Sequence, residues 1–96
     1  MSIMKPTAYL VNTSRGKIVD EAALLKVLQE KKIAGAAIDV YGTEPLPADN
    51  AIRKLENVLL TPHLGYVTAA NLVRMYQDAV EDIAAFLDGK PIRVLA

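Results

Sequence analysis

The sequence has 96 residues, of which 52% are hydrophobic and 23% are charged, as in a globular chain with one modest core. Its 11 basic residues balance 11 acidic ones, so net charge favours neither nucleic acid nor an anionic membrane as a partner. The lack of cysteine excludes disulfides and thiolate chemistry, and a single histidine excludes a His-rich metal site, so we expect no metal.

Targeting signals are also missing from the sequence. The stretch Met1-Ser2-Ile3-Met4-Lys5-Pro6 lacks the apolar run of a signal peptide. The longest apolar stretches are far shorter than a membrane-spanning helix. We therefore expect a cytoplasmic location and no membrane partner.

The first two predicted elements are a strand and a helix. Residues 9–11, Tyr-Leu-Val, form an apolar run edged by turn-forming residues, which favours a strand buried on both faces. Asp20 is placed to cap a helix whose apolar residues follow at helical spacing and which ends near Lys31 and Lys32.

Two further strands are predicted on either side of a long loop. Residues 33–40 are a second apolar run, rich in small side chains. Residues 41–50 contain a glycine and two prolines, which break regular structure. Residues 58–61 predict a third strand, which Pro62 stops.

The last predicted element is a long helix over residues 68–88. Thr68 is a suitable cap, and Gly89 and Pro91 end the helix. Its apolar face repeats at helical spacing through Leu72, Tyr76, Ala79, Val80, Ile83 and Leu87.

This order of elements predicts an α/β fold with three parallel strands joined by right-handed crossovers, followed by a long C-terminal helix. A parallel sheet normally needs cover on both faces, which two helices and one loop hardly provide. The architecture therefore resembles a part of a larger fold.

Four chemically active side chains follow the predicted strands. Arg15 follows the first, Asp39 and Glu44 lie at and after the end of the second, and His63 follows the third. In open α/β sheets ligands bind outside the carboxyl ends of the strands, so these side chains should converge there. Each also has a simpler interpretation: a turn residue for His63, a carbonyl partner for Arg15, a loop-amide partner for Asp39, and an exposed loop charge for Glu44.

Three stretches resemble the signatures of one family. Residues 4–20, with Asn-Thr-Ser-Arg-Gly at 12–16, are similar to the stretch around the catalytic arginine of the D-isomer-specific 2-hydroxyacid dehydrogenases. Residues 34–40 with Glu44-Pro45, and residues 57–65, resemble the next two signatures, in the same order. The resemblance identifies residues 1–96 as one partial, Rossmann-like NAD-binding domain, with 68–88 as its long C-terminal helix.

The resemblance implies hydride transfer between a nicotinamide cofactor and a small 2-hydroxy or 2-oxo acid. Arg15 would bind the substrate carboxylate, His63 would be the acid and base, and Glu44 would orient His63. Thr13, Asp39 and Gly65 would lie at the nicotinamide side of NAD or NADP.

The sequence departs from the family in what it omits. No G-x-G-x-x-G turn for the pyrophosphate occurs in it, and the resemblance includes neither the acidic residue that holds the adenosine half nor the substrate domain. We therefore expect the isolated chain to be inactive and to bind NADH weakly. The alternative is a non-catalytic remnant or interaction module that retains inherited site residues. We also expect a homo-oligomer, formed through the outer edge of the first strand or through the long helix.

Overall fold

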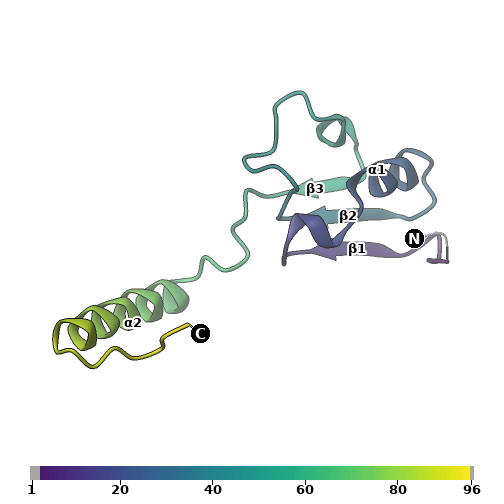
Figure 1. The fold of residues 1–96 in the computed structure, drawn as a ribbon. Helices are drawn as coiled ribbons and strands as arrows, with labels where there is room; N and C mark the ends of the chain where they lie inside the picture. Colours follow the sequence, from purple (N-terminus) through teal and green to yellow (C-terminus); the bar gives the residue numbers. More distant parts are fainter. Residues whose placement is uncertain (1–2, 96) are drawn as a thin grey trace. The chain divides into compact units, whose positions relative to one another are not determined.

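The computed structural model describes residues 3–95, and the chain forms two compact units, Met1–Gly65 and Tyr66–Ala96. The first unit contains a parallel sheet with strand order β1-β2-β3, shown in Figure 1. Its elements are β1 (Tyr9–Asn12), α1 (Glu21–Gln29), β2 (Gly35–Ile38) and β3 (Val58–Leu60). The predicted α/β class with three parallel strands is confirmed, whereas the assignment of both units to one domain stays a prediction.

The connections follow from local sequence signals. The Asp20 carboxylate caps α1 by accepting a hydrogen bond from the Ala23 amide at 3.0 Å. The connection from β2 to β3 runs through the loop 39–50 and a short 3-10 helix, η2 (Ala51–Lys54), which Asn50 caps in the same way. All three strands point in one direction, so their carboxyl ends lie at one edge of the sheet.

The core lies between α1 and one face of the sheet. Leu24 and Leu28 from α1 pack with Ile33, Ala36 and Ile38, and all five are buried. This packing explains why α1 carries apolar residues at helical spacing, because that stripe faces the sheet.

The expectation that the first strand is buried on both faces is wrong. Tyr9 and Val11 are 71% and 68% exposed, and Leu59 on the same face of the sheet is 66% exposed. Successive side chains of a strand point to opposite faces, so only alternate residues can reach the core under α1. Among the described residues of this unit, no helix covers the second face.

The second unit begins at Tyr66 and contains α2 (Ala69–Leu87) and the segment after it. The Thr68 hydroxyl caps the helix as predicted, accepting from the Asn71 amide at 3.2 Å. Arg93 donates to Glu81 and Asp82, each at 2.7 Å, and so joins the segment to the helix. The apolar face is exposed, with Tyr76 at 74% and Ile83 at 61%. In the described part of the chain, no helix is both long and apolar enough to cross a membrane.

Candidate active site

The carboxyl ends of the strands border an open cleft of about 530 Å³. The three residues that the sequence suggests as catalytic, Arg15, Glu44 and His63, all line it. The rest of the lining is Gly16, Lys17, Tyr41 and Gly42. The structure therefore brings a guanidinium, a carboxylate and an imidazole together from three separate loops.

The side chains of Glu44 and His63 form a hydrogen-bonded pair in this cleft. Glu44 Oε2 lies 2.7 Å from His63 Nδ1, and Glu44 Oε1 accepts from the Tyr41 amide at 2.9 Å. The bond to His63, and after it the Tyr41 N–H, holds the pKa of the Glu44 carboxyl below its usual value. Both side chains are about one-third exposed, at 34% for His63 and 36% for Glu44. A carboxylate with both oxygens engaged fixes the direction of the imidazole.

Arg15 lies on the loop after β1. Its Nη1 donates to the Ser14 carbonyl at 2.7 Å, the kind of carbonyl contact that a structural role would give it. The same side chain lines the cleft, and its positive charge contributes to lowering the pKa of Glu44. A guanidinium has five N–H donors in a planar fork, so this one contact leaves it able to bind a carboxylate.

Asp39 organises the loop that carries His63. Its carboxylate accepts hydrogen bonds from the Thr61 hydroxyl and from the Leu64 and Gly65 amides, both amides at 2.8 Å. The Thr61 hydroxyl is the largest cause that lowers the pKa of the Asp39 carboxyl. His63 has a backbone φ of 59°, a left-handed conformation that is uncommon outside glycine. The bonds to Asp39 on both sides of His63 hold that conformation.

The three predicted cofactor-binding residues lie together. A Cβ atom on Gly65 would be 3.0 Å from Asp39 Oδ2 and 3.5 Å from Thr13 Cβ. The Asp39 carboxylate is almost fully buried and accepts three hydrogen bonds within the chain, so it holds the Gly65 backbone beside Thr13. Within residues 3–95, no group of three or more potential ligands is placed to hold a metal ion.

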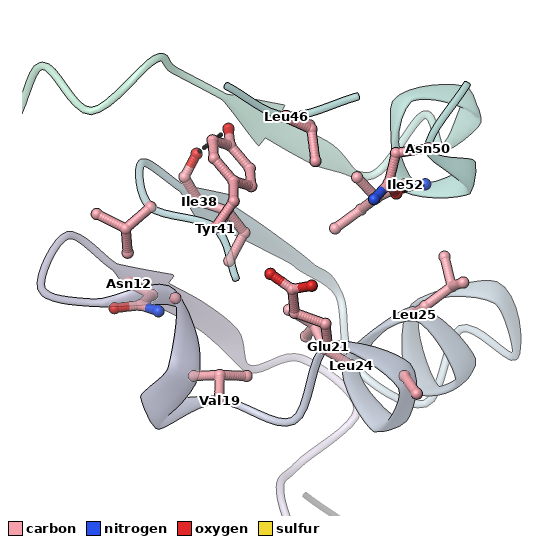
Figure 2. Close-up of a pocket in the computed structure, with 13 residues that line it drawn as sticks. Asn12, Val19, Glu21, Leu24, Leu25, Ile38, Tyr41, Leu46, Asn50 and Ile52 are labelled. Atoms are coloured by element: carbon pink, nitrogen blue, oxygen red, sulfur yellow. Dashed lines mark hydrogen bonds between the residues drawn. The ribbon is translucent and has the colours of Figure 1, made fainter. Parts of the chain in front are cut away.

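Two residues that matter for this geometry are missed by sequence reasoning. The Tyr41 hydroxyl lies 2.9 Å from both the Ile38 and the Thr61 carbonyl oxygens and shares its one hydrogen between them, which links the ends of β2 and β3. The Glu21 carboxylate accepts from the Gly42 amide at 2.6 Å. Figure 2 shows Tyr41 and Glu21 beside an apolar pocket of about 150 Å³. In the sequence, Tyr41 is one residue of an irregular loop and Glu21 is an ordinary first-turn acid, so neither gives a signal.

The lowered pKa of Asp39 predicts a pH dependence of stability. A carboxyl whose pKa is lower in the folded chain stabilises it above the unfolded pKa of about 4, and this stabilisation is lost as pH falls through the folded value. We expect Asp39→Asn to lower the midpoint of urea unfolding at pH 7. We also expect the midpoint of this variant to fall less steeply than that of the unaltered chain as pH is lowered below about 5. Asp49→Asn, in the exposed loop, is the control. An unchanged acid decline in Asp39→Asn would contradict the prediction.

Comparison with known proteins places these residues in a family. The profile described as "D-isomer specific 2-hydroxyacid dehydrogenase, NAD binding domain" matches residues 1–65, the first compact unit. A glyoxylate reductase of Korarchaeum cryptofilum is 49% identical over 87 residues, covering 91% of this chain and 26% of the relative. A D-3-phosphoglycerate dehydrogenase of Synechocystis sp. is 46% identical over 90 residues, covering 94% of this chain and 16% of the relative.

Solved structures of reductases and dehydrogenases share the fold of this chain. An acyclic imino acid reductase in complex with NADPH and D-Arg superposes with a TM-score of 0.86 at 36% identity, over 100% of this chain and 30% of the other. D-lactate dehydrogenase with NAD+ from Lactobacillus jensenii gives a TM-score of 0.81 at 29% identity, over 99% of this chain and 32% of the other. The chain spans about a quarter of the curated glyoxylate reductase that it matches. This chain therefore belongs to the D-isomer specific 2-hydroxyacid dehydrogenases, and its first 65 residues match their NAD-binding domain.

Proposed function

We propose that this chain supplies the catalytic segment of an NAD(P)-dependent oxidoreductase that interconverts D-2-hydroxy acids and 2-oxo acids. The observation that carries the proposal is the Glu44–His63 pair, with its 2.7 Å contact, in the same cleft as Arg15. Oxidation of a 2-hydroxy acid needs a group that accepts the hydroxyl proton, a cation that binds the carboxylate, and a fixed orientation of the proton acceptor. His63, Arg15 and Glu44 meet these three needs in that order.

In the proposed reaction, Arg15 binds the substrate carboxylate through its planar fork. His63 Nδ1 faces Glu44, so proton exchange with the substrate uses Nε2. In oxidation, neutral His63 takes the hydroxyl proton as the C2–H bond breaks, and Glu44 stabilises the resulting imidazolium. In reduction, the imidazolium returns that proton to the 2-oxo oxygen. Thr13, Asp39 and Gly65 would lie at the carboxamide side of a bound nicotinamide, which would supply the acceptor or donor of the hydride.

A segment exchange tests this function directly. The 87 matching residues of the Korarchaeum glyoxylate reductase are replaced by the corresponding part of this chain. We expect the hybrid to oxidise NADH or NADPH in the presence of glyoxylate, since that relative carries glyoxylate reductase in its name. A hybrid that folds and binds the cofactor but shows no turnover would contradict the proposal.

The 96-residue chain on its own is expected to bind NADH weakly, with a dissociation constant above about 100 μM. The reason is that its sequence contains no G-x-G-x-x-G turn, whose backbone amides and helix N-terminus bind the pyrophosphate. Calorimetric titration with NADH measures the constant, with the intact Korarchaeum relative as the positive control. Low-micromolar binding to the chain would show that its residues hold more of the cofactor than its nicotinamide end.

We also propose that the chain self-associates. β1 pairs only with β2 among the described strands, and Tyr9 and Val11 on its open face are 71% and 68% exposed. An edge strand with unpaired backbone groups and apolar side chains favours pairing with another chain. Light scattering during size-exclusion chromatography should detect dimers or larger species at high micromolar concentration, with Val11→Lys shifting them towards monomer. A sharp monomer peak in the unaltered chain would reject the proposal.

A further inference from the structure

The peptide between Tyr41 and Gly42 is held from two directions within the first unit. Glu21, at the start of α1, accepts the Gly42 N–H at 2.6 Å. From the loop that carries Arg15, Gly16 approaches so closely that an added Cβ would lie 2.0 Å from the Tyr41 carbonyl carbon. This peptide is therefore fixed by α1 and by the Arg15 loop, although it belongs to neither.

The position of Glu44 depends on the preceding peptide, between Val40 and Tyr41, which adjoins the first one at the Tyr41 Cα. The Tyr41 N–H donates to Glu44 Oε1 at 2.9 Å, and Glu44 Oε2 lies 2.7 Å from His63 Nδ1. A continuous series of contacts thus runs from Glu21 through the Tyr41–Gly42 backbone to Glu44 and then to the imidazole. Hydrogen bonds to a carboxylate are stronger than those between neutral groups, so the contacts at both ends of this series hold their partners tightly.

We propose that Glu21 is a positioning residue for the Glu44–His63 pair. Its carboxylate fixes the Tyr41–Gly42 backbone, and that backbone fixes Glu44. The meaning of this arrangement for catalysis rests on the proposed function, whereas the contacts themselves do not. Glu21 contacts the loop backbone and acts through Glu44, so its substitution changes the orientation of the imidazole while leaving every group of the cleft present.

Three substitutions separate this role from that of an acidic residue at a helix N-terminus, where negative charge is favourable in itself. Glu21→Gln removes the charge but keeps an acceptor oxygen at the same reach. Glu21→Asp keeps the charge but is one methylene too short to reach Gly42. Glu21→Ala removes both. A positioning role is preserved only by glutamine, and a role in the helix dipole only by aspartate.

Nuclear magnetic resonance of the 96-residue chain provides the readout, because His63 is its single histidine and gives one set of imidazole signals. In Glu21→Ala and Glu21→Asp, we expect the Tyr41 amide to exchange about tenfold faster, since its partner Glu44 is no longer fixed. The Nδ1 signal of His63 should move towards its position in Glu44→Ala. Glu21→Gln should lie closer to the unaltered chain than either of these variants, because it keeps an acceptor at the same reach although the bond is weaker. Glu30→Ala, at the other end of α1, is the control, and urea titration verifies that each variant is folded.

Two results would overturn the proposal. One is a Glu21→Ala chain in which only the Gly42 amide changes, while the Tyr41 exchange and the His63 signal do not. The other is a disturbed Glu21→Gln chain beside a normal Glu21→Asp chain, which would assign Glu21 to the helix dipole. Neither readout requires turnover, so an inactive segment-exchange hybrid would reject the proposed function and leave this inference standing.

Discussion

Replacing Gly16 with alanine is expected to destabilise the first unit by about 2–4 kcal/mol, as for severe overpacking. The new Cβ would lie 2.0 Å from the Tyr41 carbonyl carbon, 2.2 Å from its oxygen and 2.4 Å from the Gly42 nitrogen. These are backbone atoms, so no side chain can rotate away, and the two loops must separate. Separation would also shift Tyr41, whose N–H donates to Glu44.

Urea unfolding of Gly16→Ala measures this loss. The matched control is Gly42→Ala in the same unit, because an added Cβ there would meet only the Glu21 carboxylate, at 3.3 Å and at the end of a flexible side chain. That control should lose no more than about 1 kcal/mol. Similar losses in the two variants would show that the contact between Gly16 and Tyr41 is not close in solution.

Replacing His63 with alanine in the segment-exchange hybrid is expected to lower kcat for glyoxylate reduction about a hundredfold or more. The variant removes the proposed proton donor but leaves Arg15 and the Thr13, Asp39 and Gly65 cluster in place. Binding of NADH should therefore change little, and the loss should appear in turnover. Steady-state kinetics at saturating NADH, with calorimetry for cofactor binding, separates the two.

Lys54→Ala is the control for His63→Ala, because Lys54 lies in the exposed part of η2 and does not line the cleft. It should retain turnover within about twofold. A His63→Ala hybrid that keeps more than about a third of its turnover would remove His63 from the proposed chemistry. A loss of turnover in Lys54→Ala comparable to that in His63→Ala would show that the hybrid does not tolerate substitution, and the comparison would then say nothing for His63.

The elements were predictable where a local physical signal sets them. Asp20 and Thr68 cap α1 and α2 as expected, because a side-chain oxygen before an apolar periodic stretch satisfies a free amide. The error at β1 arose because Tyr-Leu-Val is apolar on both faces, and a sequence does not show which face receives a helix. Tyr9 and Val11 lie on the face of the sheet opposite α1, and both are therefore exposed.

The candidate site was predictable in its members more than in its contacts. The carboxyl-edge rule for parallel strands brings Arg15, Glu44 and His63 to one place without any knowledge of the loops. The pairing of Glu44 with the imidazole was expected from the family resemblance alone, because the loop 41–50 has no periodicity to interpret. The contributions of Tyr41 and Glu21 depend on backbone approaches between loops distant in sequence, and such approaches leave no pattern in residue type.

The hydrogen bonds that Asp39 accepts determine when the turn containing His63 forms. Its carboxylate is satisfied by Thr61, Leu64 and Gly65 of the same chain, so the turn containing His63 forms during folding. A molecule entering the cleft would therefore contact the imidazole of a residue, His63, whose backbone is already in its left-handed conformation. A mobile loop would have to become ordered each time a ligand binds. Here the turn becomes ordered once, when the polypeptide folds, and the cleft is therefore preorganised.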